Sequence, residues 1–300
     1  LEEVSGRSLG RRFEELVYKP GHAEVDLDVS WSDGVLVVNA KQTQAATDGV
    51  PSVFEMPIVL AMAGQDKPVK LRLASRADTF AVPCPERPAF VVVDPAMQIL
   101  GEVTLRAPAD MLRNQLQSAP TARGRWLAAA ARSRIDDPPT INALAARLHD
   151  ADEAWMVRVE CAEALGKIRA RECFEELVKG LTTAHPKVRR AVVDALGRFK
   201  TADAAKALTA KALRDESYLV EAEAARALGK TRQPAAFETL LDVIGRPSWA
   251  DVITAGAIDG LAQLRDDRAL PHLFTRTRYG VMARAAVQRP HDAEALAPAH

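Results

Sequence analysis

The sequence lacks an excess of charge of either sign, has few cysteines and contains no long apolar run. Its 40 Lys and Arg residues are balanced by 40 Asp and Glu residues, whereas nucleic-acid-binding domains usually carry a clear basic excess. Three cysteines in 300 residues exclude a disulfide scaffold. The longest apolar stretches resemble residues 126–131 and fall far short of the roughly 18 residues that cross a bilayer. We therefore expect neither a nucleic-acid nor a membrane partner.

The composition is that of a globular protein, with 48% hydrophobic and 27% charged residues, which excludes wholesale disorder. A length of 300 residues predicts two domains at about 150 residues per domain. The charge is mildly uneven: residues 1–108 hold 11 basic and 15 acidic residues, net −4, and the remainder holds 29 and 25, net +4. This split coincides with a change in sequence pattern.

The first part of the chain changes from a helical period to a period of two. Residues 2–17 predict a short helix, which Pro20-Gly21 ends. Residues 24–31 alternate apolar and polar side chains and predict a half-buried strand, with a turn at residues 32–34 and a returning strand. Further strands are expected at residues 54–62, 69–73, 79–82, 89–93 and 99–105. Such short strands predict a small antiparallel β-sandwich over residues 21–107, after a helical segment at 1–20.

The second part is an internal repeat. Residues 157–167 recur as 188–198 and again as 220–230, and their Leu-Gly pairs begin at residues 165, 196 and 228, at intervals of 31 and 32. A second helix is expected between copies, at residues 172–181, 204–213 and 235–244. Two helices per repeat, stacked in register, predict an α-solenoid. The unit resembles HEAT repeats of the PBS-lyase-like type, and we assign it residues 108–290, with a tail at 291–300.

Each repeat position has an expected physical role. Ala164, Ala195 and Ala227 would let neighbouring helices approach, and the leucines that follow them would fill the layer between repeats. The next residues, Gly166, Gly197 and Gly229, are expected just after each helix in the left-handed conformation. Pro186 and Pro234 are expected in first helical turns.

The N-terminal segment carries a more distinctive pattern. Leu1-Glu2-Glu3-Val4-Ser5-Gly6-Arg7-Ser8-Leu9 is followed by Phe13 and then by Tyr18-Lys19-Pro20-Gly21-His22. It resembles the segment that closes the helical part of the catalytic domain in aminopeptidase N-like zinc metallopeptidases (gluzincins), although Ala23 stands where the family often has Pro. The resemblance implies a β-sandwich next and an all-helical domain last, which in some bacterial members consists of HEAT-like repeats. The order matches nearly the whole chain.

The chemistry of that family is missing from the sequence. A His-Glu-x-x-His zinc motif needs two His residues spaced by four, with a Glu after the first, and none of the six His residues provides it. The Gly-x-Met-x-Asn motif is also missing, since the similar residues 280–284 end in Arg284. We therefore assign no catalytic, metal or cofactor-binding residue and expect this chain not to be an enzyme. The chain begins with Leu1, and we expect it to be the C-terminal part of a zinc metalloaminopeptidase whose catalytic domain, with its zinc, lies upstream.

Several reactive or charged residues receive structural interpretations. Cys161 and Cys173 fall on successive helices of one repeat and are expected to pack in the core, and Cys84 is assigned no role. Arg158 and Arg189 occupy equivalent positions, at which the third copy has Glu221. We expect them to pair with acidic residues of an adjacent repeat, such as Glu163 or Asp194, rather than to hold a ligand.

Other polar and aromatic clusters are interpreted in the same way. The basic run at residues 187–190 is expected to be a solvated helix start, and Asp136-Asp137-Pro138-Pro139 a loop leading into a helix. Trp126, Trp155 and Trp249 recur near helix starts and are expected to pack in the core or between repeats.

Three hypotheses for function stay open. In the first, the sandwich acts as a spacer and the solenoid limits which peptides reach the zinc site, so the partners are the chain's own catalytic domain and its peptide substrates. In the second, an independent scaffold binds a protein or peptide on the concave solenoid face. The third, DNA binding, predicts a basic concave face and has little support from a net charge of +4 in the second part. Unpaired cysteines slightly favour the cytoplasm, although any targeting segment would precede this chain.

One substitution tests the repeat register. Leu196→Asp places a charge in a layer between repeats, and we expect it to abolish cooperative unfolding of the solenoid, because a buried unpaired charge is costly. Thermal unfolding followed by circular dichroism measures this, and an unchanged melt would show that the register is wrong.

Overall fold

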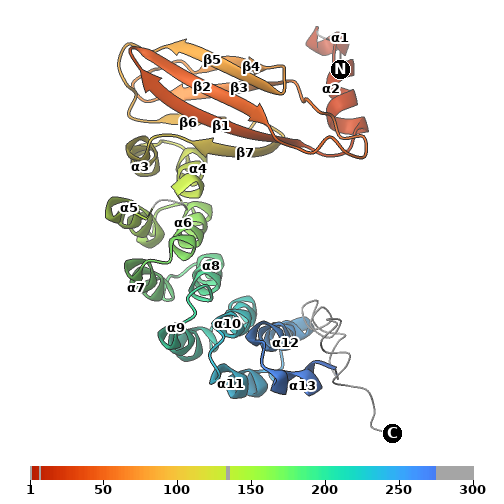
Figure 1. Cartoon of the computed structure of the whole chain (residues 1–300), viewed down its shortest axis with the longest axis vertical. Helices are drawn as coiled ribbons and strands as arrows, with labels where there is room; N and C mark the ends of the chain where they lie inside the picture. Colours follow the sequence, from red (N-terminus) through yellow and green to blue (C-terminus); the bar gives the residue numbers. More distant parts are fainter. Residues whose placement is uncertain (1, 7, 133–135, 275–300) are drawn as a thin grey trace. The chain divides into compact units, whose positions relative to one another are not determined.

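The computed structural model describes residues 2–6, 8–132 and 136–274, and the chain divides into two compact units, residues 1–132 and 133–300. The first unit contains two β-sheets and the second contains helical repeats (Figure 1). The predicted fold class is therefore confirmed. The predicted tail, residues 291–300, and the predicted end of the repeats at residue 290 lie outside the described residues.

Two sheets face each other in the first unit. One has the strand order β5-β2-β1-β7 and the other β4-β3-β6. The strands are β1 (Ala23–Ser32), β2 (Val35–Gln42), β3 (Met56–Met62), β4 (Val69–Leu73), β5 (Ala77–Pro83), β6 (Val91–Val93) and β7 (Gly101–Arg106). Alternate residues of β1, such as Val25, Leu27 and Val29, are buried and share one apolar cluster with residues of the other sheet, such as Ile58 and Leu60. The alternation predicted from the sequence therefore places one side of each sheet in the core.

The β1–β2 hairpin forms at the predicted turn. Asp33 and Gly34 both have positive φ angles, of 50° and 79°, which is what the favoured two-residue hairpin turn requires at both central positions. Ser32 and Val35 pair directly across it.

One strand pair departs from the expected antiparallel arrangement. β7 runs parallel to β1, with Val25 opposite Val103. Parallel neighbours need a long connection rather than a tight turn. In the sequence, all the other strands lie between β1 and β7. The alternation within each strand gives no information about its direction, so sequence patterning could not reveal this pairing.

The helices α3 (Ala109–Ser118) and α4 (Ala122–Arg132) belong to the first unit. Met111, Leu112 and Leu127 from these helices are part of the same buried cluster as the sandwich strands. The sequence assigns both helices to the start of the repeats, whereas in the structure they cover the core of the sandwich.

The N-terminal segment is not the single helix expected over residues 2–17. It forms two short helices, α1 (Glu2–Ser5) and α2 (Gly10–Phe13), followed by the π-helical turn η1 (Glu14–Tyr18). Gly6 has a φ of 63° and ends α1, because a left-handed residue does not continue a right-handed helix. The Glu2 carboxylate then accepts hydrogen bonds from the backbone N–H groups of Leu9 and Gly10, at the start of α2.

The second unit consists of two layers of helices (Figure 1). The first-helix layer contains α6 (Trp155–Ile168), α8 (Pro186–Leu196), α10 (Tyr218–Lys230) and α12 (Val252–Leu264), each packed against the next. The second-helix layer contains α5 (Pro138–His149), α7 (Arg171–Gly180), α9 (Ala202–Ala207) continued by the π-helical turn η2 (Leu208–Ala212), and α11 (Ala236–Val243). Short 3-10 turns η3 (Trp249–Asp251) and η4 (Asp267–Ala269) precede α12 and α13 (Leu270–Phe274). This alternation confirms the predicted pair of helices per repeat.

Two of three helix starts have the residues that the sequence predicts there. Pro186 is in the first turn of α8, and Asp137 caps α5 by accepting a hydrogen bond of 2.7 Å from the N–H of Thr140. Pro234 lies just before α11 rather than inside its first turn.

The repeated glycines have a different role from the one expected. None of Gly166, Gly197 and Gly229 has a positive φ angle. The left-handed residues that follow helices α6, α10 and α12 are instead Arg169, Arg232 and Arg265.

The glycines lie where consecutive first helices touch. A Cβ atom on Gly166 would lie 2.7 Å from the Cβ of Ala195, and one on Gly197 would lie 2.8 Å from the Cα of Ala227. At Gly229 it would overlap the backbone of Gly260. The glycines, together with the predicted small Ala residues, therefore set the separation of neighbouring repeats.

A glycine substitution distinguishes close packing from helix propensity. Alanine stabilises an ordinary helix position by about 1 kcal/mol relative to glycine, but Gly229→Ala is expected to lower the free energy of unfolding by about 1–3 kcal/mol, because α10 and α12 must move apart. Chemical denaturation measures the change. Gly245→Ala is the control, since a Cβ there meets nothing within 4 Å. Equal effects of the two substitutions would contradict the packing role.

Candidate functional site

Two buried arginines hold successive repeats together. Arg158 is 7% exposed and donates from Nε to the carbonyl oxygen of Leu148, at the end of α5, at 2.9 Å. Arg189 is 6% exposed and donates to the carbonyls of Thr183 and Ala184 at 2.9 and 2.8 Å. These carbonyls follow or end helices of the second-helix layer, where backbone acceptors lack helical partners.

Arg189 also forms a little-exposed charge pair with Asp215. Its guanidinium donates two hydrogen bonds of 2.8 Å to the Asp215 carboxylate and one of 2.9 Å to Glu216, and the bond to Asp215 raises the pKa of Arg189. The prediction of acidic partners in an adjacent repeat is confirmed for Arg189, although Glu163 and Asp194 are not those partners. Arg158 instead donates to the backbone carbonyl of Leu148. The prediction of a solvated run at residues 187–190 is wrong at Arg189, which is buried.

The third repeat replaces this arginine with Glu221, and a different arginine takes over. Arg246 donates to the carbonyl oxygen of Leu213 and lies 3.6 Å from the Glu221 carboxylate. Burial raises the pKa of Glu221, although Arg246 opposes that effect. A guanidinium therefore still donates to a backbone carbonyl in this repeat, but it belongs to Arg246, in the loop after α11.

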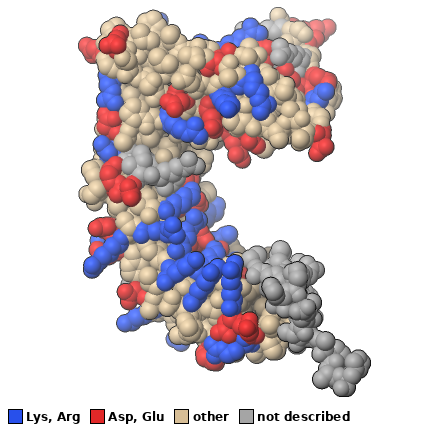
Figure 2. Space-filling view, in the orientation of Figure 1, with Lys and Arg blue, Asp and Glu red and all other residues tan. Residues whose placement is uncertain are grey.

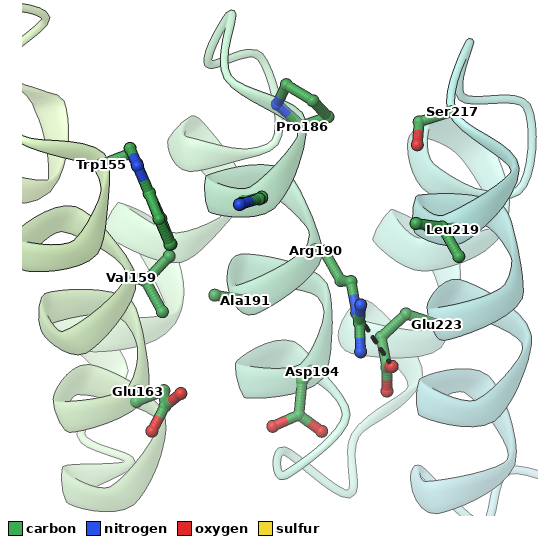
Figure 3. A pocket seen from close by; sticks show the side chains of 11 residues that line it. Trp155, Val159, Glu163, Pro186, Arg190, Ala191, Asp194, Ser217, Leu219 and Glu223 are labelled. Atoms are coloured by element: carbon green, nitrogen blue, oxygen red, sulfur yellow. Dashed lines mark ion pairs between the residues drawn. The ribbon is translucent and has the colours of Figure 1, made fainter.

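Side chains of α6, α8 and α10 line a groove of about 560 Å3 on the first-helix layer (Figure 3). Three consecutive repeats contribute side chains to it. Its lining consists of Trp155, Val159, Glu163, Pro186, Lys187, Arg190, Ala191, Asp194, Ser217, Leu219 and Glu223. A groove that crosses repeats is the kind of extended surface with which solenoids bind partners. It is therefore the candidate site.

Trp155 forms an exposed aromatic part of the groove. Its ring is stacked on His185, with ring centres 5.7 Å apart, and the Lys187 ammonium lies 4.1 Å from the ring centre. Trp155 is nevertheless 38% exposed, and Leu219, on α10, is 54% exposed. His185 is held in place because its Nδ1 accepts a hydrogen bond from the N–H of Lys187, which caps α8. The site thus keeps a large apolar surface in contact with solvent.

This arrangement corrects the packing role predicted for the tryptophans. Trp126 is partly buried against the sandwich core, as expected. Trp249 is 77% exposed and Trp155 is stacked at the surface. Recurrence near helix starts identified the positions, but it gave no information on which side of the helix they face.

Charged side chains line the rest of the groove. Glu223 is only 11% exposed and lies 3.6 Å from Arg190, 3.5 Å from Arg226 and 3.7 Å from Lys230. Asp194 pairs with Arg198 and Lys230. Burial alone would raise the pKa of Asp194, but these two cations hold it below its usual value. The Asp194 carboxylate is therefore held in its ionised form by Lys230 and Arg198.

The cysteines offer no reactive site. Cys161 and Cys173 are both fully buried and unpaired, and burial raises the pKa of each thiol. This confirms their packing role. Cys84 is also buried and donates from Sγ to the carbonyl oxygen of Glu86 at 3.1 Å.

The part of the chain that the structure describes holds neither a metal-ligand cluster nor a membrane-spanning helix. Across residues 2–6, 8–132 and 136–274, no group of three or more His, Cys, Asp and Glu side chains is placed to hold a metal ion. Within the same ranges, no helix combines the length and apolar character of a membrane span.

Comparison with known proteins agrees with the two-part architecture. The family model for HEAT repeats matches residues 151–212 and 207–288. The solved structure of Legionella pneumophila aminopeptidase A in complex with aspartic acid is similar over 95% of this chain and 41% of that chain, with 13% identity and a TM-score of 0.59. This likeness shows a shared fold, and this chain spans less than half of the aminopeptidase.

Two further solved structures resemble parts of the chain. The complex of CpcE and CpcF of phycocyanin lyase from Nostoc sp. PCC7120 has 18% identity, with a TM-score of 0.38, and covers 62% of this chain and 91% of that one. Human deoxyhypusine hydroxylase in complex with glycerol also has 18% identity, with a TM-score of 0.28, and covers 59% of this chain and 82% of that one. No curated protein matches the sequence. The family match and the described elements together make this chain two β-sheets followed by a helical HEAT-repeat region.

The buried pair is open to a direct test. Arg189→Ala is expected to lower the free energy of unfolding by about 3–5 kcal/mol, because it leaves Asp215 buried without its main partner. Chemical denaturation measures the loss. The control is Arg171→Ala, which removes a surface pair with Glu175 from a side chain that is 88% exposed and should leave stability almost unchanged. Similar losses from both variants would contradict the role given to Arg189.

Proposed function

We propose that this chain is the non-catalytic sandwich and repeat region of an aminopeptidase-like protein, and that its repeats bind polypeptide segments in the groove over α6, α8 and α10. The observation that carries this proposal is the groove itself, which crosses three consecutive repeats and keeps apolar and charged side chains together. The fold shared with Legionella aminopeptidase A over 95% of this chain supports its aminopeptidase part.

The shape of the groove suits an extended chain. Neighbouring packed helices lie about 8–10 Å apart, so three of them present about 20 Å, which about six residues of extended polypeptide span. The mixture of an aromatic ring, an exposed leucine and paired charges is typical of surfaces that bind side chains of several kinds. In the complete protein, such binding would limit which peptides reach a zinc site in a preceding catalytic domain.

An independent scaffold is the second candidate. It is favoured by the HEAT repeats themselves, since repeat proteins present extended surfaces to protein partners. The two candidates differ in what binds: short unstructured peptides for the first, and a folded partner that short peptides do not displace for the second.

Peptide binding in the groove is tested with matched substitutions. Fluorescein-labelled peptides of about eight residues and mixed sequence, long enough for about six extended residues, are titrated with the protein and followed by anisotropy. Ala191→Arg fills the groove and is expected to weaken binding about tenfold or more. Ala202→Arg, an exposed position at the start of α9, is the control and should bind like the unchanged protein. Equal binding by both variants would contradict the groove as the site.

The non-catalytic part is tested by activity. The chain is expected to show no turnover of aminoacyl-arylamide substrates and no tightly bound stoichiometric zinc. Turnover that resists a zinc chelator, or one zinc per chain after dialysis, would overturn this part of the proposal without affecting the binding test.

A further inference from the structure

On the groove face of the first-helix layer, several cations are more exposed than the carboxylates that they contact. The groove lining itself holds Lys187 and Arg190 together with the acidic Glu163, Asp194 and Glu223. Four further cations pair with these acids or with Asp259 beside the lining, namely Lys167, Arg198, Arg226 and Lys230. The side chain of Arg190 is 53% exposed, whereas those of Glu223 and Asp259 are 11% and 13% exposed. Figure 2 shows blue side chains gathered over the helices α6, α8 and α10.

Two of the carboxylates are shared between cations. Glu223 lies within 3.5–3.7 Å of three of them, and Asp194 contacts two. An arginine has five N–H donors and a lysine three, so pairing with one or two carboxylate oxygens does not use all of them. The acids thus anchor the cations in place without covering them.

An apolar part of the groove lies beside these cations. Trp155 and Leu219 are exposed there, and Val159 and Ala191 complete the apolar surface between α6 and α8. Lys187 is in contact with the Trp155 ring, so the apolar surface and the first cation adjoin directly.

We propose that the polypeptide bound by this groove is an acidic segment, in which one apolar side chain lies against Trp155 and Leu219 and the following Asp or Glu side chains pair with Lys187 and Arg190. This rests on the proposed function and adds the chemical class of its ligand. Complementary charge would speed association and select against basic segments, because like charges on the two sides are costly. The apolar contact supplies the buried area that charge pairs at an exposed rim lack.

A nucleic acid fits the same face less well. The exposed side chain of Leu219 offers no contact to a phosphate backbone. An acidic peptide places apolar and charged groups in turn along the chain, as the groove does. The distinction is made experimentally with an oligonucleotide as one of the probes.

The experiment compares four probes of matched length by fluorescence anisotropy. Three labelled peptides of about eight residues carry one leucine followed by Glu, Gln or Lys residues, and the fourth probe is an oligo-dT of the same charge as the Glu peptide. We expect the Glu peptide to bind about tenfold or more tightly than the Gln peptide, and the Lys peptide not to bind. The preference for Glu should shrink as salt is raised.

A charge reversal locates the effect. Lys187→Glu removes the cation beside Trp155, and the helix dipole favours an acidic residue in the first turn of α8, so the fold should be kept. It is expected to remove most of the preference for the Glu peptide. Lys200→Glu makes the same change of net charge at an exposed residue just before the start of α9, outside the groove lining, and should keep the preference. Circular dichroism confirms that both variants fold.

The outcomes separate the two proposals. Equal affinity for the Glu and Gln peptides, or equal effects of Lys187→Glu and Lys200→Glu, overturns the acidic ligand and leaves the peptide groove standing. Failure of all three peptides overturns the proposed function as well. Tighter binding of the oligonucleotide than of the Glu peptide overturns both in favour of a nucleic-acid ligand.

Discussion

The close approach of consecutive first helices is the constraint on which the repeat region depends. Gly166, Gly197 and Gly229 bring each helix against the backbone or an alanine of the next one, where a Cβ atom would overlap its neighbour. This contact repeats at the sequence period, so the exposed side chains of α6, α8 and α10 recur at a fixed spacing. A groove that continues from repeat to repeat follows from that spacing rather than from any single side chain.

The buried arginines donate hydrogen bonds to backbone carbonyl groups that lack helical partners in the stacked repeats. Layers of short helices leave carbonyl acceptors where the second helices end, in a region from which the next repeat excludes water. Arg158, Arg189 and Arg246 each donate to such a carbonyl. Two of these come from equivalent positions and the third from a loop, so what is preserved between repeats is the satisfied acceptor rather than the residue that satisfies it.

The sequence could predict the features that repeat. It could not predict strand direction or the distance between neighbouring helices, because the patterns carry no information on either. Strand alternation and the Leu-Gly period identified the sheets, the paired helices and the buried leucines. The parallel β1–β7 pair does not alter alternation, so it could not be read from it. The repeated glycines were assigned to helix ends because that is their commonest use, yet a helix in contact with another helix needs glycine for distance. The groove was missed because no motif marks a surface assembled from three repeats.

Composition was also an incomplete guide to the surface. The chain is neutral overall, but net charge does not distinguish a buried carboxylate from an exposed one. On the groove face, Glu223 and Asp259 are less exposed than every arginine or lysine that contacts them. At these pairs, a ligand approaching from solvent meets the cations before the carboxylates that fix their directions. At these pairs the exposed charge is therefore positive, which the residue count alone does not show.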